Sequence, residues 1–236
     1  MISTKCRHIR DENGRIPSYA ALKKIITASL HESLAALGTS YIDVFMLHQA
    51  DPDILENVDV ASIFTALKQS GMIRATGVST YTPEETKEAM NAGAWDVIQL
   101  PFNLLDQRQE ACFAEASAKG IGIMVRSVLL KGLLSDRGRH LHPALIKVEE
   151  HIERYHTIID TSFTGLPAFA TKFALSFPEI SSVLVGIDKV EYLHQSLAAV
   201  NGRYLDEKIM LQARALAYPE PAFLNLAQWS KNGWLA

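Results

Sequence analysis

A histidine stands where an apolar stretch of the chain gives way to polar residues. The stretch 41–47 reads YIDVFML, and the polar residues His48, Gln49 and Asp51 come next. Apolar, β-branched and aromatic residues in such a run indicate a buried parallel strand, because both faces of that kind of strand are covered. Ligands bind at the carboxyl ends of parallel strands, so His48 is a candidate proton or hydrogen-bond donor. The alternative is a histidine that only caps the strand.

The composition is that of one soluble globular domain, which we expect to span residues 1–236. The chain is 48% hydrophobic and 21% charged. Its net charge of -3 does not indicate binding to nucleic acid. It has no apolar run of about 18 residues, and its first residues lack the apolar core of a signal peptide. Cys6 and Cys112 are too few for a disulfide framework. We therefore expect a cytoplasmic protein that does not enter a membrane.

Strands and helices are predicted to alternate along the chain. Apolar runs predict strands at 1–6, 41–47, 73–78, 96–100, 121–125 and 180–185. Helical spacing and capping residues predict helices at 18–37, 58–69, from Thr82 onward, and at 107–119, 143–155, 165–177, 189–200, 206–217 and 220–230. An alternation of about 30 residues per unit indicates a parallel sheet built from right-handed βα units.

Several segments together resemble the aldo-keto reductase family. The segment 37–43 (LGTSYID), followed by His48, is similar to the signature of that family. The segments 71–79 (GMIRATGVS), 97–103 (VIQLPFN) and 182–186 (SVLVG) agree with the family in order and spacing. The resemblance covers almost the whole chain, and the chain is therefore identified as a member of this family.

The resemblance implies a TIM-barrel-type fold of parallel β/α units. Such a barrel has eight strands, whereas six are predicted here, and the strand at 1–6 corresponds to the third strand of the family. The first two βα units have no counterpart in this chain. We therefore expect an incomplete barrel over residues 1–205, followed by a helical tail over 206–236.

The resemblance also implies hydride transfer between a nicotinamide cofactor and a carbonyl group. In the family a Tyr donates the proton, a Lys lowers the pKa of that Tyr, an Asp pairs with the Lys, and a His orients the carbonyl. Lys5 matches the Lys and His48 matches the His; otherwise Lys5 is a solvated lysine. No residue matches the Tyr or the Asp, and Tyr81 is near the same face but not at the family position. We therefore expect this chain alone to be inactive or weakly active in ordinary carbonyl reduction.

The resemblance assigns Ser79, Gln99 and Arg126 to the nicotinamide end of the cofactor, and Ser127 is a further candidate cofactor-binding residue. Ser79 and Gln99 match residues that hold the carboxamide, although both could instead be ordinary caps at strand ends. Arg126 and Ser127 begin the segment after the strand at 121–125. Many family members have an aromatic residue at the position of Arg126, and a planar guanidinium can also stack on a ring.

The last strand and helix hold the adenosine end in the family. Gly186 and Lys189 fit this region, where backbone N–H groups at a helix start bind phosphate. Ser196 is a further candidate, although Tyr192 and Ser196 stand where NADP-binding members often carry Gln and Asn. Asp188 stands where NADP-binding members often carry Arg, and its carboxylate would repel a 2′-phosphate, although Lys189 offers a compensating charge. We therefore expect the cofactor to be NAD(P), with a preference for NADP in doubt.

Two function classes follow from these residues. The first is an aldo-keto reductase-like oxidoreductase acting on an aldehyde or ketone, which includes sugar-derived carbonyls. The second is a catalytically degenerate family member that binds a ligand or a partner protein. No metal site is expected, because His140 and His142 lack further ligands at a suitable spacing.

Self-association is the first testable expectation. A six-stranded parallel sheet cannot close at eight-stranded geometry, so its outer strands would expose unpaired backbone groups and apolar faces. Either a second copy of the chain covers these edges or the terminal helices do. Sedimentation is expected to detect a homo-oligomer. A well-folded monomer with full amide protection in the strands at 1–6 and 180–185 would count against a partner.

Overall fold

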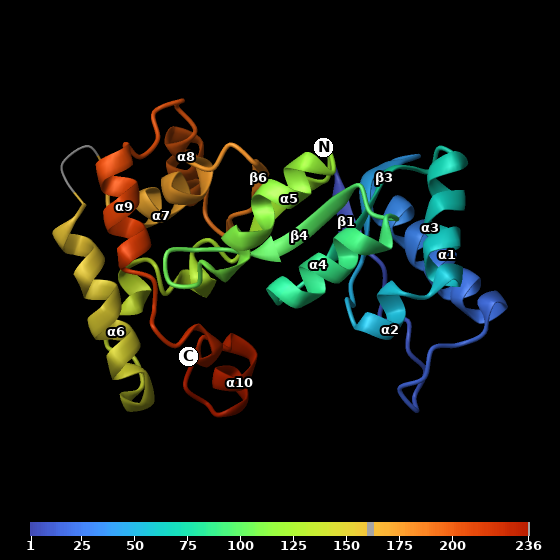
Figure 1. Ribbon diagram of the computed structural model, residues 1–236, viewed down its shortest axis with the longest axis horizontal. Helices are drawn as coiled ribbons and strands as arrows, with labels where there is room; N and C mark the ends of the chain where they lie inside the picture. The colour runs from blue at the N-terminus through green and yellow to red at the C-terminus, as the bar shows by residue number, and fades with distance from the viewer. Residues whose placement is uncertain (160–162, 236) are drawn as a thin grey trace. The chain divides into compact units, whose positions relative to one another are not determined.

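The chain forms a parallel α/β sheet, as the sequence predicts. The structure is a computed structural model, and it describes residues 1–159 and 163–235. Six strands are hydrogen-bonded in chain order (Figure 1). They are β1 (Ser3–Lys5), β2 (Ile42–Leu47), β3 (Ile73–Ser79), β4 (Val97–Pro101), β5 (Gly122–Arg126) and β6 (Ile180–Val183). Neighbouring strands in sequence are neighbours in the sheet, which is what right-handed βα units produce.

The chain divides into two compact units. Unit 1 comprises Met1–Leu100 and Ala111–Met124, and unit 2 comprises Pro101–Glu110 and Val125–Ala236. Unit 1 contains the helices α1 (Tyr19–Leu37), α2 (Pro52–Leu55), α3 (Val58–Gln69), α4 (Pro83–Ala92) and α5 (Phe113–Ala118). Unit 2 contains α6 (Ile146–Glu153), α7 (Leu166–Leu175), α8 (Val190–Ala199), α9 (Glu207–Ala215) and α10 (Leu226–Lys231).

Helix α3 packs on the sheet of unit 1 through aromatic contacts. The ring of Phe64 lies 5.5 Å from that of Phe45 on β2 and 5.2 Å from that of Trp95, measured between ring centroids. Aromatic pairs at this separation stabilise a core beyond the area that they bury. Helix α1 lies beside α3 (Figure 1) and buries Leu22, Ile26 and other residues of one face. These contacts hold the helical layer against β2, the strand that leads to His48.

A glycine lets β2 and β3 pack closely in the sheet core. Gly77 pairs with Met46 across the two strands, and both lie near the buried cluster of Val44, Met46 and Met124. A Cβ atom at position 77 would lie 2.8 Å from the Cγ of Met46. The absence of a side chain at Gly77 is therefore a packing requirement of this register.

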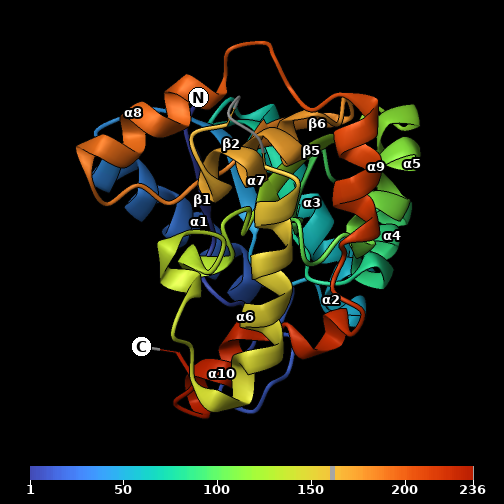
Figure 2. The ribbon, with the colours of Figure 1, turned by 90° about the vertical axis from the view of Figure 1, so that its left-hand side faces the viewer.

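Unit 2 is held together by aromatic residues and by a buried tyrosine. Phe102 stacks on Phe173 of α7, with ring centroids 5.5 Å apart. The hydroxyl of Tyr155 hydrogen-bonds the carbonyl of Leu104 at 2.6 Å and also contacts the carbonyl of Leu216, which follows α9. Burial raises the pKa of Tyr155, so the phenol stays protonated. The end of α9 is thereby fixed against the α6 region of the same unit (Figure 2).

Several predicted helices differ in detail from those observed. The expected helix at 107–119 is a 3₁₀ segment, Arg108–Cys112, followed by α5. The expected continuous helix at 220–230 was wrong: a 3₁₀ turn at Pro221–Phe223 is separated from α10. The break has a local cause, because the side chain of Asn225 accepts a hydrogen bond from the backbone N–H of Gln228 and starts a new helix. Among the described residues, no helix is long and apolar enough to cross a membrane.

The caps of α1 and α3 give a matched test of local stability. The side chain of Asn57 accepts hydrogen bonds from the backbone N–H groups of Asp59 and Val60, at 2.9 and 3.2 Å. Ser18 caps α1 but makes no such side-chain bond. We expect Asn57→Ala to lower the free energy of unfolding by about 1 kcal/mol, and Ser18→Ala to change it far less. Urea unfolding followed by circular dichroism measures both, and equal losses would contradict this assignment of the caps.

Candidate active site

Four of the residues singled out in the sequence lie at one edge of the sheet in unit 1. Lys5 is the last residue of β1, His48 follows the last residue of β2, and Ser79 is the last residue of β3. Gln99 on β4 pairs with Ser79 in the strand register. Because β1 to β4 pair in parallel, their carboxyl ends meet at the same edge. The register therefore places these four polar residues, from segments far apart in sequence, at the same edge of the sheet.

Ser79 and Gln99 provide a buried polar pair suited to a carboxamide. Ser79 is 1% exposed and Gln99 is 5% exposed. In the part of the chain that the structure describes, the Oγ of Ser79 has no hydrogen-bond partner. A buried hydroxyl without a partner costs free energy, so such groups mark places where a ligand completes the bonding. A nicotinamide carboxamide offers both a donor and an acceptor, and it fits a serine beside a glutamine.

His48 and Lys5 are both half-buried, and a cysteine lies close to both. The backbone N–H of His48 hydrogen-bonds the sulfur of Cys6, the residue after Lys5. Cys6 is 1% exposed, and burial raises the pKa of its thiol to about 11. The thiol is therefore neutral at physiological pH.

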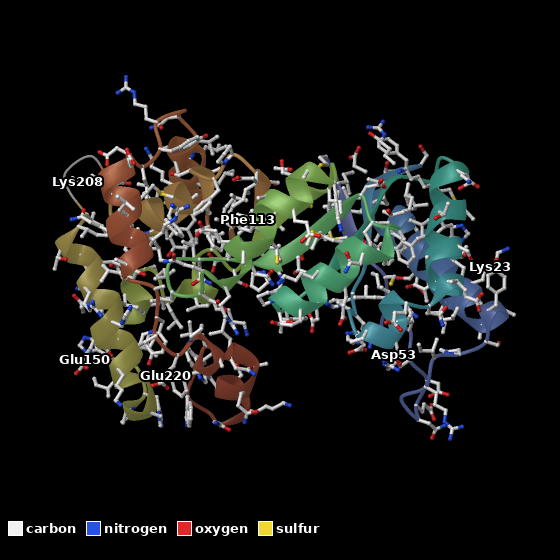
Figure 3. All side chains as sticks on the ribbon, in the orientation of Figure 1. Lys23, Asp53, Phe113, Glu150, Lys208 and Glu220 are labelled. Atoms are coloured by element: carbon white, nitrogen blue, oxygen red, sulfur yellow. The ribbon has the colours of Figure 1, made fainter. Side chains whose placement is uncertain are left out.

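The loop after β1 is fixed along the loop after β2. The backbone N–H of Ile9 donates to the Oε1 of Gln49 at 2.8 Å. The guanidinium of Arg10 donates to Asp51 at 3.1 Å and to Asp53 on α2 at 2.6 Å. Asp53 is labelled in Figure 3. Between these anchors and β1, the ring of His8 contacts that of His48, with centroids 4.8 Å apart. The sequence analysis missed His8, because only the fold brings the two loops together.

A cavity of about 680 Å³ lies within unit 2. It is lined by the loop after β5, by the start of α7 and by the segment from β6 into α8. Three of the predicted cofactor residues, Ser127, Gly186 and Ser196, lie in this lining. A cavity of this size matches the pockets that hold small ligands and cofactors.

Two further predicted cofactor residues lie beside this cavity lining. Arg126 donates from its Nη1 to the Oγ of Ser127 at 3.3 Å. The ammonium of Lys189 lies 5.7 Å from the ring centroid of Tyr192, in cation–π geometry. Lys189 is therefore engaged with its own helix, whereas Tyr192 is one of the residues that line the cavity.

Asp188 faces a cation that the sequence analysis did not identify. A carboxylate oxygen of Asp188 lies 3.8 Å from the Nη2 of Arg137, and both residues line the cavity. Both side chains are well exposed, so the pair is weak in water. Arg137 lies about 50 positions before Asp188 in the chain, and no local pattern links the two.

The loop that carries Arg137 has a strained backbone. In the described residues, positive φ angles outside glycine occur at Ser127, Leu130, Lys131 and His140, all in this one segment. Conformations of this kind cost free energy and cluster at ligand sites. Gly138 is required by the same loop, since a Cβ there would lie 2.1 Å from the carbonyl oxygen of Leu133. The backbone conformation of this loop therefore lowers the local stability.

Polar groups at the carboxyl ends of parallel strands, together with a lined cavity near the last strand, are typical of parallel α/β enzymes. The chain belongs to the aldo/keto reductase family, whose family model matches residues 1–216. The predicted family membership is confirmed.

Individual relatives and a solved structure agree with this family assignment. The chain is 26% identical to an uncharacterized oxidoreductase of Bacillus subtilis, YqkF, over 88% of this chain and 71% of that protein. It is 25% identical to an NADH-specific methylglyoxal reductase of Escherichia coli, over 85% of this chain and 69% of that protein. An aldo-keto reductase from Bacillus halodurans, in its holo form, has a similar structure: TM-score 0.74, 25% identity, 92% of this chain and 72% of that one.

The burial of Cys6 predicts that its thiol is unreactive in the folded chain. The thiolate is the nucleophile, and a pKa raised to about 11 leaves almost no thiolate at pH 8. We expect iodoacetamide to leave Cys6 unmodified in the folded chain and to alkylate it in concentrated urea. Peptide mass spectrometry measures both states. Alkylation of Cys6 in the folded chain at pH 8 would contradict the burial of its thiol.

Proposed function

We propose that this protein transfers a hydride between a nicotinamide cofactor and a small aldehyde or ketone. The observation that carries the proposal is the buried Ser79–Gln99 pair, with an unpartnered Ser79 hydroxyl, at the strand edge that also holds His48 and Lys5. Family membership supports the same reaction class. When bound, the nicotinamide supplies the hydride.

The side chains at the strand edge would perform the other tasks of the reaction. Ser79 and Gln99 hydrogen-bond the carboxamide and thereby fix the face of the ring that meets the substrate. His48 donates a hydrogen bond to the carbonyl oxygen and a proton as negative charge develops there. The ammonium of Lys5 stabilises the same developing charge. Because no residue of the chain matches the family tyrosine, we propose that the rate of this chain alone is low.

The cavity of unit 2 is proposed to hold the adenosine end of the cofactor. Ser127, Gly186 and Ser196 lie in its lining, where backbone and hydroxyl groups can bind phosphate. Asp188 lies in the same lining beside Arg137. A 2′-phosphate would meet the Asp188 carboxylate and compete with it for Arg137, whereas ribose hydroxyls can donate to that carboxylate. NAD is therefore proposed to bind at least as well as NADP.

Turnover by the purified chain tests the proposed reaction. We expect slow oxidation of NADH with methylglyoxal, glyceraldehyde 3-phosphate or sugar aldehydes, followed by absorbance; relatives are named for substrates of these kinds. His48→Ala is expected to lower kcat about 10²-fold or more, because a positioned acid is lost. Lys5→Met should lower it as well. His31→Ala, on the exposed face of α1, is the matched control and should leave kcat unchanged.

Two outcomes would contradict the proposed reaction. Turnover that persists in both His48→Ala and Lys5→Met would show that other residues carry the chemistry. NADH binding with no turnover of any carbonyl would favour the alternative class, a family member that binds a nucleotide or a partner without catalysis.

Cofactor preference is tested by calorimetry. NADH is expected to bind at least as tightly as NADPH, and Asp188→Asn should improve NADPH binding relative to NADH by about 3–10-fold, since removing an exposed like charge has a modest effect. Glu191→Gln is the control, because Glu191 is an exposed acid in the first turn of α8. Clearly tighter NADPH binding by the unaltered chain would overturn the role given to Asp188.

A further inference from the structure

We propose that His8 is a positioning residue for His48 and passes protons between solvent and the His48 ring; this inference rests on the proposed function. The structural feature that carries it is the contact between the two imidazole rings, whose centroids lie 4.8 Å apart at an interplanar angle of 58°. His8 is exposed and His48 is half-buried. The two rings therefore connect the solvent with the strand edge.

The position of His8 is fixed by its neighbours on both sides. Cys6 is buried, and its sulfur accepts a hydrogen bond from the backbone N–H of His48. Ile9 is fully buried, and its backbone N–H donates to Gln49 at 2.8 Å. The backbone before and after His8 is therefore attached to the same loop that carries His48. This attachment keeps the His8 backbone close to the loop that carries His48, whose ring the His8 ring contacts.

Charged groups surround the pair. The Lys5 ammonium at the end of β1 is a nearby cation, and the guanidinium of Arg10 is paired with Asp51 and Asp53. Because His8 is exposed, its ring can take a proton from water and pass it to His48 after His48 has given up its own.

The proposed proton path balances with the carbonyl reduction. Two electrons arrive at the carbonyl carbon as hydride, the C–O π bond breaks, and the oxygen takes a proton from the His48 imidazolium. His8 then takes a proton from water and passes it to neutral His48. The net reaction consumes the reduced cofactor, one proton and the carbonyl compound, and it yields the oxidised cofactor and an alcohol.

Kinetics of His8 variants give the first test. We expect His8→Gln to lower kcat about 5–10-fold, to leave the KM for NADH unchanged and to shift the pH profile of kcat. In His8→Ala, added imidazole should restore much of the lost rate, which a purely structural role would not permit. His31→Gln, on an exposed face of α1, is the control. Unchanged kcat and pH profile in His8→Gln, or a loss that imidazole does not restore, would overturn the proposal.

Histidine NMR gives a second test that needs no turnover. The ring resonances of His48 are followed against pH in the ¹⁵N-labelled chain and in His8→Gln. Because the two rings are in contact, removal of the His8 ring should change the pH dependence of the His48 ring resonances. An unchanged midpoint would overturn the inference even if the chain reduces carbonyls. A shifted midpoint in a chain without turnover would support the pair while the proposed function fails.

Discussion

The in-register parallel pairing of β1 to β4 is the constraint on which the strand-edge site depends. Each strand contributes one polar residue at or near its carboxyl end, and parallel pairing brings the four ends to the same edge. Aromatic packing of Phe64 against Phe45 holds the helical layer on β2. Gly77 leaves room for the side chains of Met46 and Val44 that lie beside it in this register. A shift of one residue in either strand would turn Ser79 or Gln99 to the opposite face.

Elements determined by neighbouring residues were predictable. Helix α3 has the predicted bounds 58–69, and Thr82 caps α4 with the predicted capping box. The strand at 41–47 was predictable because an apolar run indicates a buried strand without knowledge of its neighbours in the sheet. The predicted residues Lys5, His48 and Ser79 lie at or directly after strand ends, and Gln99 lies within β4 opposite Ser79.

Features set by contacts distant in sequence were not predictable. His8 lies in a loop that the sequence predicts only to be polar, and its contact with His48 requires the pairing of β1 with β2. Arg137 meets Asp188 only because a strained loop folds back within unit 2. Positive φ angles at Ser127 and Lys131 follow no local signal, since these residue types do not favour that conformation. Single-sequence patterns therefore locate the strand ends better than they locate the loops that shape the cavity.

The two units carry chemically different groups. Within the described residues, the strand edge of unit 1 has a buried hydroxyl without a hydrogen-bond partner and a histidine, which suit a carboxamide and a reacting carbonyl. The cavity of unit 2 has exposed charges and backbone groups, which suit phosphate and ribose.

The most direct test of the strand-edge site is a titration of the ¹⁵N-labelled chain with nicotinamide mononucleotide, followed by backbone amide chemical shifts. This ligand carries the carboxamide but lacks the adenosine portion. The largest shift changes are expected at Ser79, Gln99 and His48, and nicotinic acid mononucleotide, with a carboxylate in place of the carboxamide, should bind more weakly. Shift changes confined to residues away from this edge, or equal binding of the two compounds, would contradict a carboxamide site formed by Ser79 and Gln99.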